Sequence, residues 1–136
     1  MRKAILLALL LACRAAQAEQ WVSLGKIDNG NKETFVDVSS IRIDGGIRRG
    51  SSKVVFALHA QAGAGEYASK WVSYFSYRFA FNCADKMGRV EGMSGNFDDG
   101  TTYIDRYYPK PWQAVPVAPK TNWTTLMEFV CAWESK

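Results

Sequence analysis

Residues 70–83 constrain the fold of this chain more than any other segment, because apolar and polar side chains alternate along them. This period of two is typical of a β-strand with one face against a core and the other toward solvent. One face of the predicted strand carries Trp71, Phe75, Tyr77, Phe79, Phe81 and Cys83. The other face carries Tyr74, Arg78 and Asn82. One side of this strand is therefore built to pack in a core.

Further β-rich runs are separated by short turn sequences. The predicted strands cover residues 21–27, 33–38, 53–61, 89–97 and 101–108. Asn29-Gly30 and Asp99-Gly100 are typical of tight hairpin turns, whereas residues 39–44 look irregular and Gly45-Gly46 ends them. Connections this short make neighbouring strands antiparallel. The sequence thus predicts an antiparallel sheet of about six strands.

The C-terminal part of the chain changes character. All four prolines fall within residues 109–119, which excludes a central strand or a helix interior there. From Thr121 onward the apolar residues recur at helical spacing. One side of this predicted helix carries Trp123, Leu126, Met127, Val130, Cys131 and Trp133, and the opposite side carries Thr124, Thr125 and Glu128. We therefore expect an α+β fold in which the helix packs on the aromatic face of the sheet.

The start of the helix offers two interpretations. Asn122-Trp123-Thr124 matches a glycosylation sequon. However, the N-terminal signal described next looks bacterial, and Asn122 lies where a helix begins. We therefore expect Asn122 to cap the helix.

The first eighteen residues read as an export signal. Arg2 and Lys3 precede an apolar run, and Ala16-Gln17-Ala18 has the small-x-small form that signal peptidase cuts. This predicts a signal peptide over 1–18 and one domain over 19–136. A second interpretation is open, because Leu10-Leu11-Ala12-Cys13 resembles a lipobox in which Cys13 is acylated and anchors the chain to a membrane.

Cleavage after Ala18 leaves Cys83 and Cys131 in an oxidising compartment. We expect them to form a disulfide that ties the helix to the end of the 70–83 strand, the alternative being two buried free thiols. The same cleavage removes three basic residues and leaves 14 basic against 13 acidic ones, a net charge of +1. A charge this small argues against nucleic acid as a partner.

No catalytic or cofactor motif stands out. His59 is the only histidine, which argues against a histidine metal cluster and leaves a structural role for this residue. Asp98 and Asp99 lie in a predicted hairpin turn, where aspartate bonds to nearby backbone. We therefore expect no enzyme activity, no cofactor and no metal site. The remaining candidate is an exposed patch of Tyr74 and Arg78 with Tyr107 or Tyr108, although ordinary cross-strand pairing explains these residues equally well.

Several features together resemble the surface-adhesin protein E family of Gram-negative bacteria. They are Trp21-Val22, Phe35-Val36-Asp37 leading to Ser40-Ile41, the strand ending at Cys83, and the closing Trp112, prolines and helix with Cys131. The resemblance spans nearly the whole exported chain. It implies an antiparallel sheet whose C-terminal helix is tied to it by a disulfide between Cys83 and Cys131.

The resemblance also implies a function. Adhesion is the activity for which the family is named, and it includes a surface lipoprotein that binds host extracellular-matrix proteins such as vitronectin and laminin and that can form a homodimer. We therefore expect an exported, non-catalytic binding module with a protein ligand, located in the periplasm or on the outer membrane. The alternative is a periplasmic accessory or structural domain that binds an envelope component.

Overall fold

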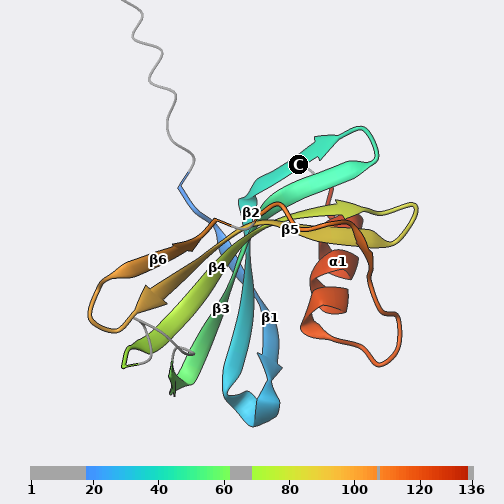
Figure 1. Cartoon of the computed structure of the whole chain (residues 1–136). Helices are drawn as coiled ribbons and strands as arrows, with labels where there is room; N and C mark the ends of the chain where they lie inside the picture. Colours follow the sequence, from blue (N-terminus) through green and yellow to red (C-terminus); the bar gives the residue numbers. More distant parts are fainter. Residues whose placement is uncertain (1–17, 62–68, 107, 135–136) are drawn as a thin grey trace, which may run out of the picture.

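The computed structural model describes residues 18–61, 69–106 and 108–134, which form one antiparallel sheet and one helix (Figure 1). The strands are β1 (Trp21–Ile27), β2 (Lys32–Asp44), β3 (Ile47–Gln61), β4 (Trp71–Asn82), β5 (Met87–Phe97), β6 (Thr102–Asp105) and β7 (Gln113–Ala114). The helix is α1 (Asn122–Ala132), and a short turn of 3-10 helix, η1 (Asp28–Gly30), joins β1 to β2. Strands β1 to β6 pair in chain order, and the two-residue β7 pairs with β5. The predicted six-stranded sheet with a C-terminal helix is confirmed.

The first hairpin turn lies at Asn29-Gly30, as predicted. Asn29 has a φ of 54° and Gly30 a φ of 88°. Both values lie in the left-handed region, which asparagine and glycine tolerate better than other residues. The turn chemistry therefore fixes the register in which β1 and β2 pair.

The prediction of an irregular segment over 39–44 is wrong, because β2 continues to Asp44 and pairs with β3 there. The register shifts between Asp37 and Arg42, and polar side chains replace the missing ladder bonds. The Ser40 hydroxyl donates to the carbonyl of Asp37 at 2.6 Å and accepts from the backbone N–H of Ser51 at 2.8 Å. A bulge bridged by a serine thus looks like a loop in the sequence.

The placement of Trp71 in the core is also wrong, since this side chain is 47% exposed. Pairing between β4 and β5 shifts between Val72 and Tyr74. An extra residue in one strand interrupts the alternation of side chains. Val72 is therefore the buried residue at this end of β4, with 2% of its surface exposed.

The core lies between the sheet and α1. Phe79 and Phe81 of β4 are fully buried, and they pack with Val36 of β2 and with Leu126 and Val130 of α1. Phe75 and Tyr77, farther along the same face, are only partly buried. The helix thus covers one end of the aromatic face, which agrees with its position beside one side of the sheet in Figure 1.

The proline-containing segment crosses along β5 instead of forming a long strand. Strand β6 ends at Asp105, before the predicted end at residue 108. The backbone N–H of Lys110 then donates to Val90, and that of Val115 donates to Lys86. These bonds guide the chain toward α1 and bury Val115 in the core.

Thr121, not Asn122, caps the start of α1. The Thr121 hydroxyl accepts from the backbone N–H of Thr124, while the Thr124 hydroxyl accepts from the backbone N–H of Thr121. Thr124, which was expected on the polar side, is 1% exposed, and its hydroxyl lies 2.6 Å from the carbonyl of Pro116. Asn122 is the first helical residue. A threonine pair closes this helix end as a capping box does.

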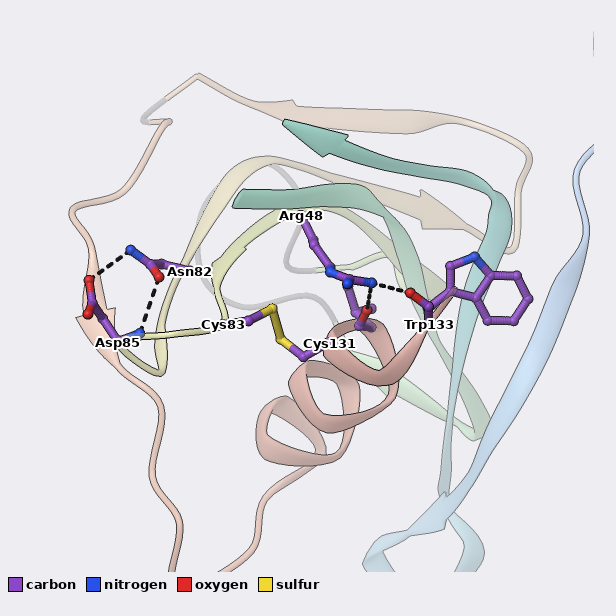
Figure 2. The surroundings of a disulfide bond; sticks show 7 residues. Arg48, Asn82, Cys83, Asp85, Cys131 and Trp133 are labelled. Atoms are coloured by element: carbon purple, nitrogen blue, oxygen red, sulfur yellow. Dashed lines mark hydrogen bonds between the residues drawn. A yellow bond between two sulfur atoms is a disulfide. The ribbon is translucent and has the colours of Figure 1, made fainter. Parts of the chain in front are cut away.

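The other end of α1 is fixed to the sheet by two features that Figure 2 shows. Cys83 and Cys131 form the predicted disulfide, with their Cα atoms 5.7 Å apart. Arg48 of β3 donates to the carbonyls of Val130, at 3.1 Å, and of Trp133. No basic residue lies in the last turn of α1. Arg48 therefore supplies from the sheet the positive charge that a helix C-terminus favours.

Candidate binding face

The side of the sheet opposite α1 carries two rows of side chains that cross the strands. Phe79 and Phe81 point toward α1, so the alternate residues Ser76 and Arg78 point away from it. The strand register aligns with them a first row of Phe35, Lys53, Ser76, Ser94 and Ile104. The second row is Trp21, Asp37, Ser51, Arg78 and Gly92. We call the surface formed by these two rows the open face.

A hollow of about 410 Å³ lies on the open face. Ser51, Ser76, Gly92 and Ser94 line it with short side chains. The hollow reaches from Trp21 on the edge strand β1 to Ile104 on the edge strand β6. The hollow lies where these side chains of β3, β4 and β5 are short.

An aromatic cluster surrounds Lys53 beside the hollow. The Lys53 Nζ atom lies 4.1 Å from the ring centre of Trp21, 5.5 Å from that of Phe35 and 5.9 Å from that of Tyr74. The Trp21 Nε1–H donates to a carboxylate oxygen of Glu19 at 2.9 Å. Contacts between an ammonium group and aromatic faces hold both in place without neutralising the charge.

Arg78 lies over the hollow because residue 92 is a glycine. A Cβ atom on residue 92 would stand 2.7 Å from Arg78 Nη2 and 2.8 Å from its Nε. The guanidinium Nη2 donates a long hydrogen bond, 3.4 Å, to the carbonyl of Glu91. Gly92 therefore lets the arginine lie flat across β5.

The open face has cations without carboxylate partners. Lys53, Arg78 and Arg106 form no ion pair with any residue in the described part of the chain. By contrast, Glu91 pairs with Arg89 at 2.8 Å and with Arg49 at 3.4 Å next to the hollow. Glu19, Glu91 and Asp105 also line the hollow, so it presents charges of both signs to a ligand.

The predicted patch of tyrosines and arginine is brought together in part. Arg78 and Tyr108 line the same hollow, and Tyr74 lies beside Lys53. Tyr107 lies outside the described residues. Trp21, Lys53 and Ile104 were not predicted to join this surface. Only the cross-strand register aligns them with Arg78 and Ser76, and that register is not readable from each strand alone.

Tyr77 and Tyr108, two residues that line the hollow, keep neutral hydroxyls over the physiological pH range. Burial and the charge of Tyr108 raise the pKa of Tyr77 to about 12. Burial, with the charges of Asp105 and Tyr103, also raises the pKa of Tyr108. The Tyr108 hydroxyl donates to the sulfur of Met93 at 3.6 Å. These groups can form hydrogen bonds with a ligand, but they are poorly suited to remove a proton from it.

The remaining candidate residues lie elsewhere. His59 belongs to β3, but the structure does not describe its side chain. Cys13 and residues 62–68 lie outside the described residues. Asp99 accepts from the backbone N–H and the hydroxyl of Thr101 in the β5–β6 turn, at 2.9 and 2.5 Å. These bonds and Lys70 lower the pKa of Asp99 to about 2. Its contacts support the predicted turn role.

The described residues contain no cluster of three or more histidine, cysteine, aspartate or glutamate side chains placed to hold a metal ion. The same residues include no helix with the length and apolar character needed to span a membrane.

Comparison with known proteins finds a matching family model and similar solved structures. A family model described as surface-adhesin protein E matches residues 21–132. Crystal form II of Haemophilus influenzae protein E is similar with a TM-score of 0.59 and 16% identity, and the match covers 81% of this chain and 87% of that one. Protein E from non-typeable Haemophilus influenzae has a TM-score of 0.56 at 16% identity, with 81% and 75% covered. At such identity the structural likeness establishes the fold alone. No curated protein sequence gives a significant match.

Proposed function

This chain belongs to the surface-adhesin protein E family, and on that premise we propose that it is an exported, non-catalytic adhesin whose open face binds a protein ligand. The observation that carries the proposal is the hollow of about 410 Å³ flanked by unpaired cations and aromatic rings. Membership of a family of surface adhesins implies export, and the Cys83–Cys131 disulfide suits an oxidising compartment.

The composition of the open face is that of a protein-binding surface. Tryptophan, tyrosine and arginine are the residues most enriched among those that dominate binding energy at interfaces. Trp21, Tyr74 and Arg78 lie within the two rows or beside them. The short side chains between them leave space for ligand side chains to enter. We therefore expect the ligand to present apolar side chains together with charged ones.

Host extracellular-matrix proteins are the ligands to test first. We propose vitronectin and laminin, which the family resemblance implies as partners. The disulfide-bonded protein is passed over each immobilised ligand, and we expect saturable binding at micromolar concentration that weakens as salt rises. Absence of saturable binding to both ligands would contradict the host-matrix proposal.

Three substitutions test whether the open face is the contact surface. Lys53→Ala and Arg78→Ala remove unpaired cations, and each is expected to weaken binding by about tenfold. Gly92→Ala displaces the Arg78 side chain without removing its charge, so it should weaken binding similarly. Lys120→Ala is the matched control, because it removes an exposed cation that pairs with Glu128 away from this face. If all four variants bind as the unaltered protein does, the ligand lies on another surface.

A further inference from the structure

The hollow on the open face has a floor of serine hydroxyls that form no bond within the described part of the protein. Ser51, Ser76 and Ser94 line it from the neighbouring strands β3, β4 and β5, and Ser76 is the register partner of Ser94. None of the three hydroxyls bonds to a described residue, and none of the three oxygens is fully buried. They are therefore open to a ligand that enters the hollow.

Other serines on the strands use their hydroxyls within the protein. Ser23 donates to the carboxylate of Glu33 at 2.6 Å, and Ser73 donates to that of Asp98. Ser40 bridges the bulge in β2, where it both donates and accepts. A hydroxyl has one donor and two acceptor sites. The serines of the hollow, unlike these, keep both kinds of site free for a ligand.

Charged groups of both signs stand around this floor. The Arg78 guanidinium donates one long hydrogen bond, 3.4 Å, to the carbonyl of Glu91. One carboxylate oxygen of Glu19 accepts from Trp21, and the other forms no hydrogen bond with the described residues. A ligand hydroxyl can accept from the guanidinium and donate to the carboxylate, whereas a charged ligand group would be attracted by one and repelled by the other. The mixture of charges therefore favours a neutral ligand rich in hydroxyls.

The size and the aromatic lining of the hollow also suit a saccharide. Its volume of about 410 Å³ lies in the lower part of the range of roughly 300–1,000 Å³ that is usual for small-molecule sites. This space holds one or two sugar rings. Trp21 and Tyr108 line the hollow with aromatic side chains, whose negative ring faces attract the C–H groups of a sugar ring.

We propose that the hollow binds a neutral saccharide of one or two rings, carried by the protein ligand. Ser51, Ser76 and Ser94 bond to the sugar hydroxyls, and Arg78 and Glu19 add a donor and an acceptor. A peptide side chain brings few polar groups into such a space, whereas a sugar ring has a hydroxyl on almost every carbon and so engages all three serines at once. This inference rests on the proposed function, because it names the chemistry that the same hollow recognises.

Maltose, lactose and N,N′-diacetylchitobiose are suitable probes, because all are neutral disaccharides and they differ in stereochemistry and substituents. Each is titrated into the disulfide-bonded protein while the backbone amide resonances of Ser51, Gly92 and Ser94 are followed by NMR. We expect saturable shifts with at least one probe at millimolar concentration, and an affinity that does not fall as salt rises. The double variant Ser76→Ala with Ser94→Ala should bind that probe about tenfold more weakly, because two partners of the sugar hydroxyls are lost.

Two further variants keep the test decisive. Ser23→Ala with Ser73→Ala is the matched control, because it removes two strand hydroxyls that do not line the hollow, and it should bind the probe as the unaltered protein does. Ser94→Phe places a large ring in the hollow and should abolish binding. The proposal is overturned if no probe gives saturable shifts, if the Ser76 and Ser94 double variant binds as tightly as the control, or if Ser94→Phe still binds.

The outcome for the saccharide site is separable from that for the host-matrix ligands. Saturable binding to vitronectin or laminin with no response to any disaccharide would overturn the saccharide site and leave the adhesin proposal in place. Saturable binding of a disaccharide without binding to either matrix protein would support the saccharide site and contradict the host-matrix proposal.

Discussion

At the scale of single residues, the core depends on two glycines that face phenylalanine rings. A Cβ atom at residue 50 would lie 2.7 Å from Phe79 Cζ, and one at residue 88 would lie 2.8 Å from Phe81 Cδ1. Both rings are fully buried, so neighbouring side chains leave them little room to move. The two glycines thus allow the large rings of β4 to lie across the adjacent strands.

Gly88→Ala tests this packing. We expect it to lower the free energy of unfolding by about 1–3 kcal/mol, because an extra methyl group must displace Phe81 or Trp123. Urea unfolding with an unchanged slope measures the effect. Gly46→Ala is the control, since a Cβ there meets nothing within 4 Å. Equal stability of the two variants would show that the core absorbs the methyl group.

Asp37 makes stability depend on pH. Burial raises the pKa of its carboxyl group. Hydrogen bonds from Ser39 and Gln20 and the charge of Arg42 together lower this pKa by more than burial raises it, so the net shift is downward. A lowered pKa means that the unfolded chain takes up a proton first as pH falls, so the stabilisation is present above about pH 4 and is lost in acid. Asp37→Asn should therefore destabilise most at neutral pH. Unfolding measured at pH 7 and pH 3 should show the gap shrinking, and a constant gap would contradict this account.

At the scale of elements, α1 is held at both ends by residues outside its own sequence. The disulfide and Arg48 hold the C-terminal end, and Thr121 closes the N-terminal end. A helix of 11 residues is only marginally stable in isolation, so it depends on such contacts. The helix is therefore a docked element whose stability comes from the sheet.

Removing the disulfide should loosen α1 while most of the sheet stays formed. We expect the variant Cys83→Ser with Cys131→Ser to exchange amide hydrogens faster over residues 125–133, because Cys131 no longer links the helix to β4. Amides in the centres of β3 and β4 should keep their protection. Equally slow exchange over 125–133 in the variant would show that packing and Arg48 hold the helix without the covalent link.

The elements with a clear period could be predicted from the sequence, whereas their irregularities could not. The alternation along β4 and the helical spacing of Leu126, Met127 and Val130 each reflect one buried face. The bulges near Asp37 and Val72 depend on how two strands pair, which a single strand does not reveal. The open face was missed in part for the same reason, since Trp21 and Arg78 come together only through the register of four strands.

At the scale of the whole molecule, the first residues that the structure describes lie beside the open face. Glu19 and Trp21 both line the hollow. A lipid on Cys13 would leave five residues, 14–18, between the acylated cysteine and Glu19, a reach of about 20 Å when fully extended. Such a short tether would hold the hollow close to the membrane and restrict the approach of a large ligand.

We expect processing to follow Ala18 and to produce a chain that starts at Glu19. Intact mass spectrometry of the protein from its native host, with membrane and soluble fractions analysed separately, measures this directly. Cys13→Ser is the control, because it should leave the mature mass unchanged if cleavage follows Ala18. A membrane-bound species with an acylated Cys13 would show that the domain is anchored and that the tether geometry limits access to its ligand.

The pleat of the sheet has a consequence for how such proteins diversify. Alternate residues of β4 serve separate purposes, since Phe79 and Phe81 fill the core while Ser76 and Arg78 face outward. A substitution in the outward set therefore changes recognition without disturbing the packing that maintains the scaffold. Lineages that inherit this architecture can acquire new partners by exchanging surface residues, and two descendants with the same backbone need not share a ligand.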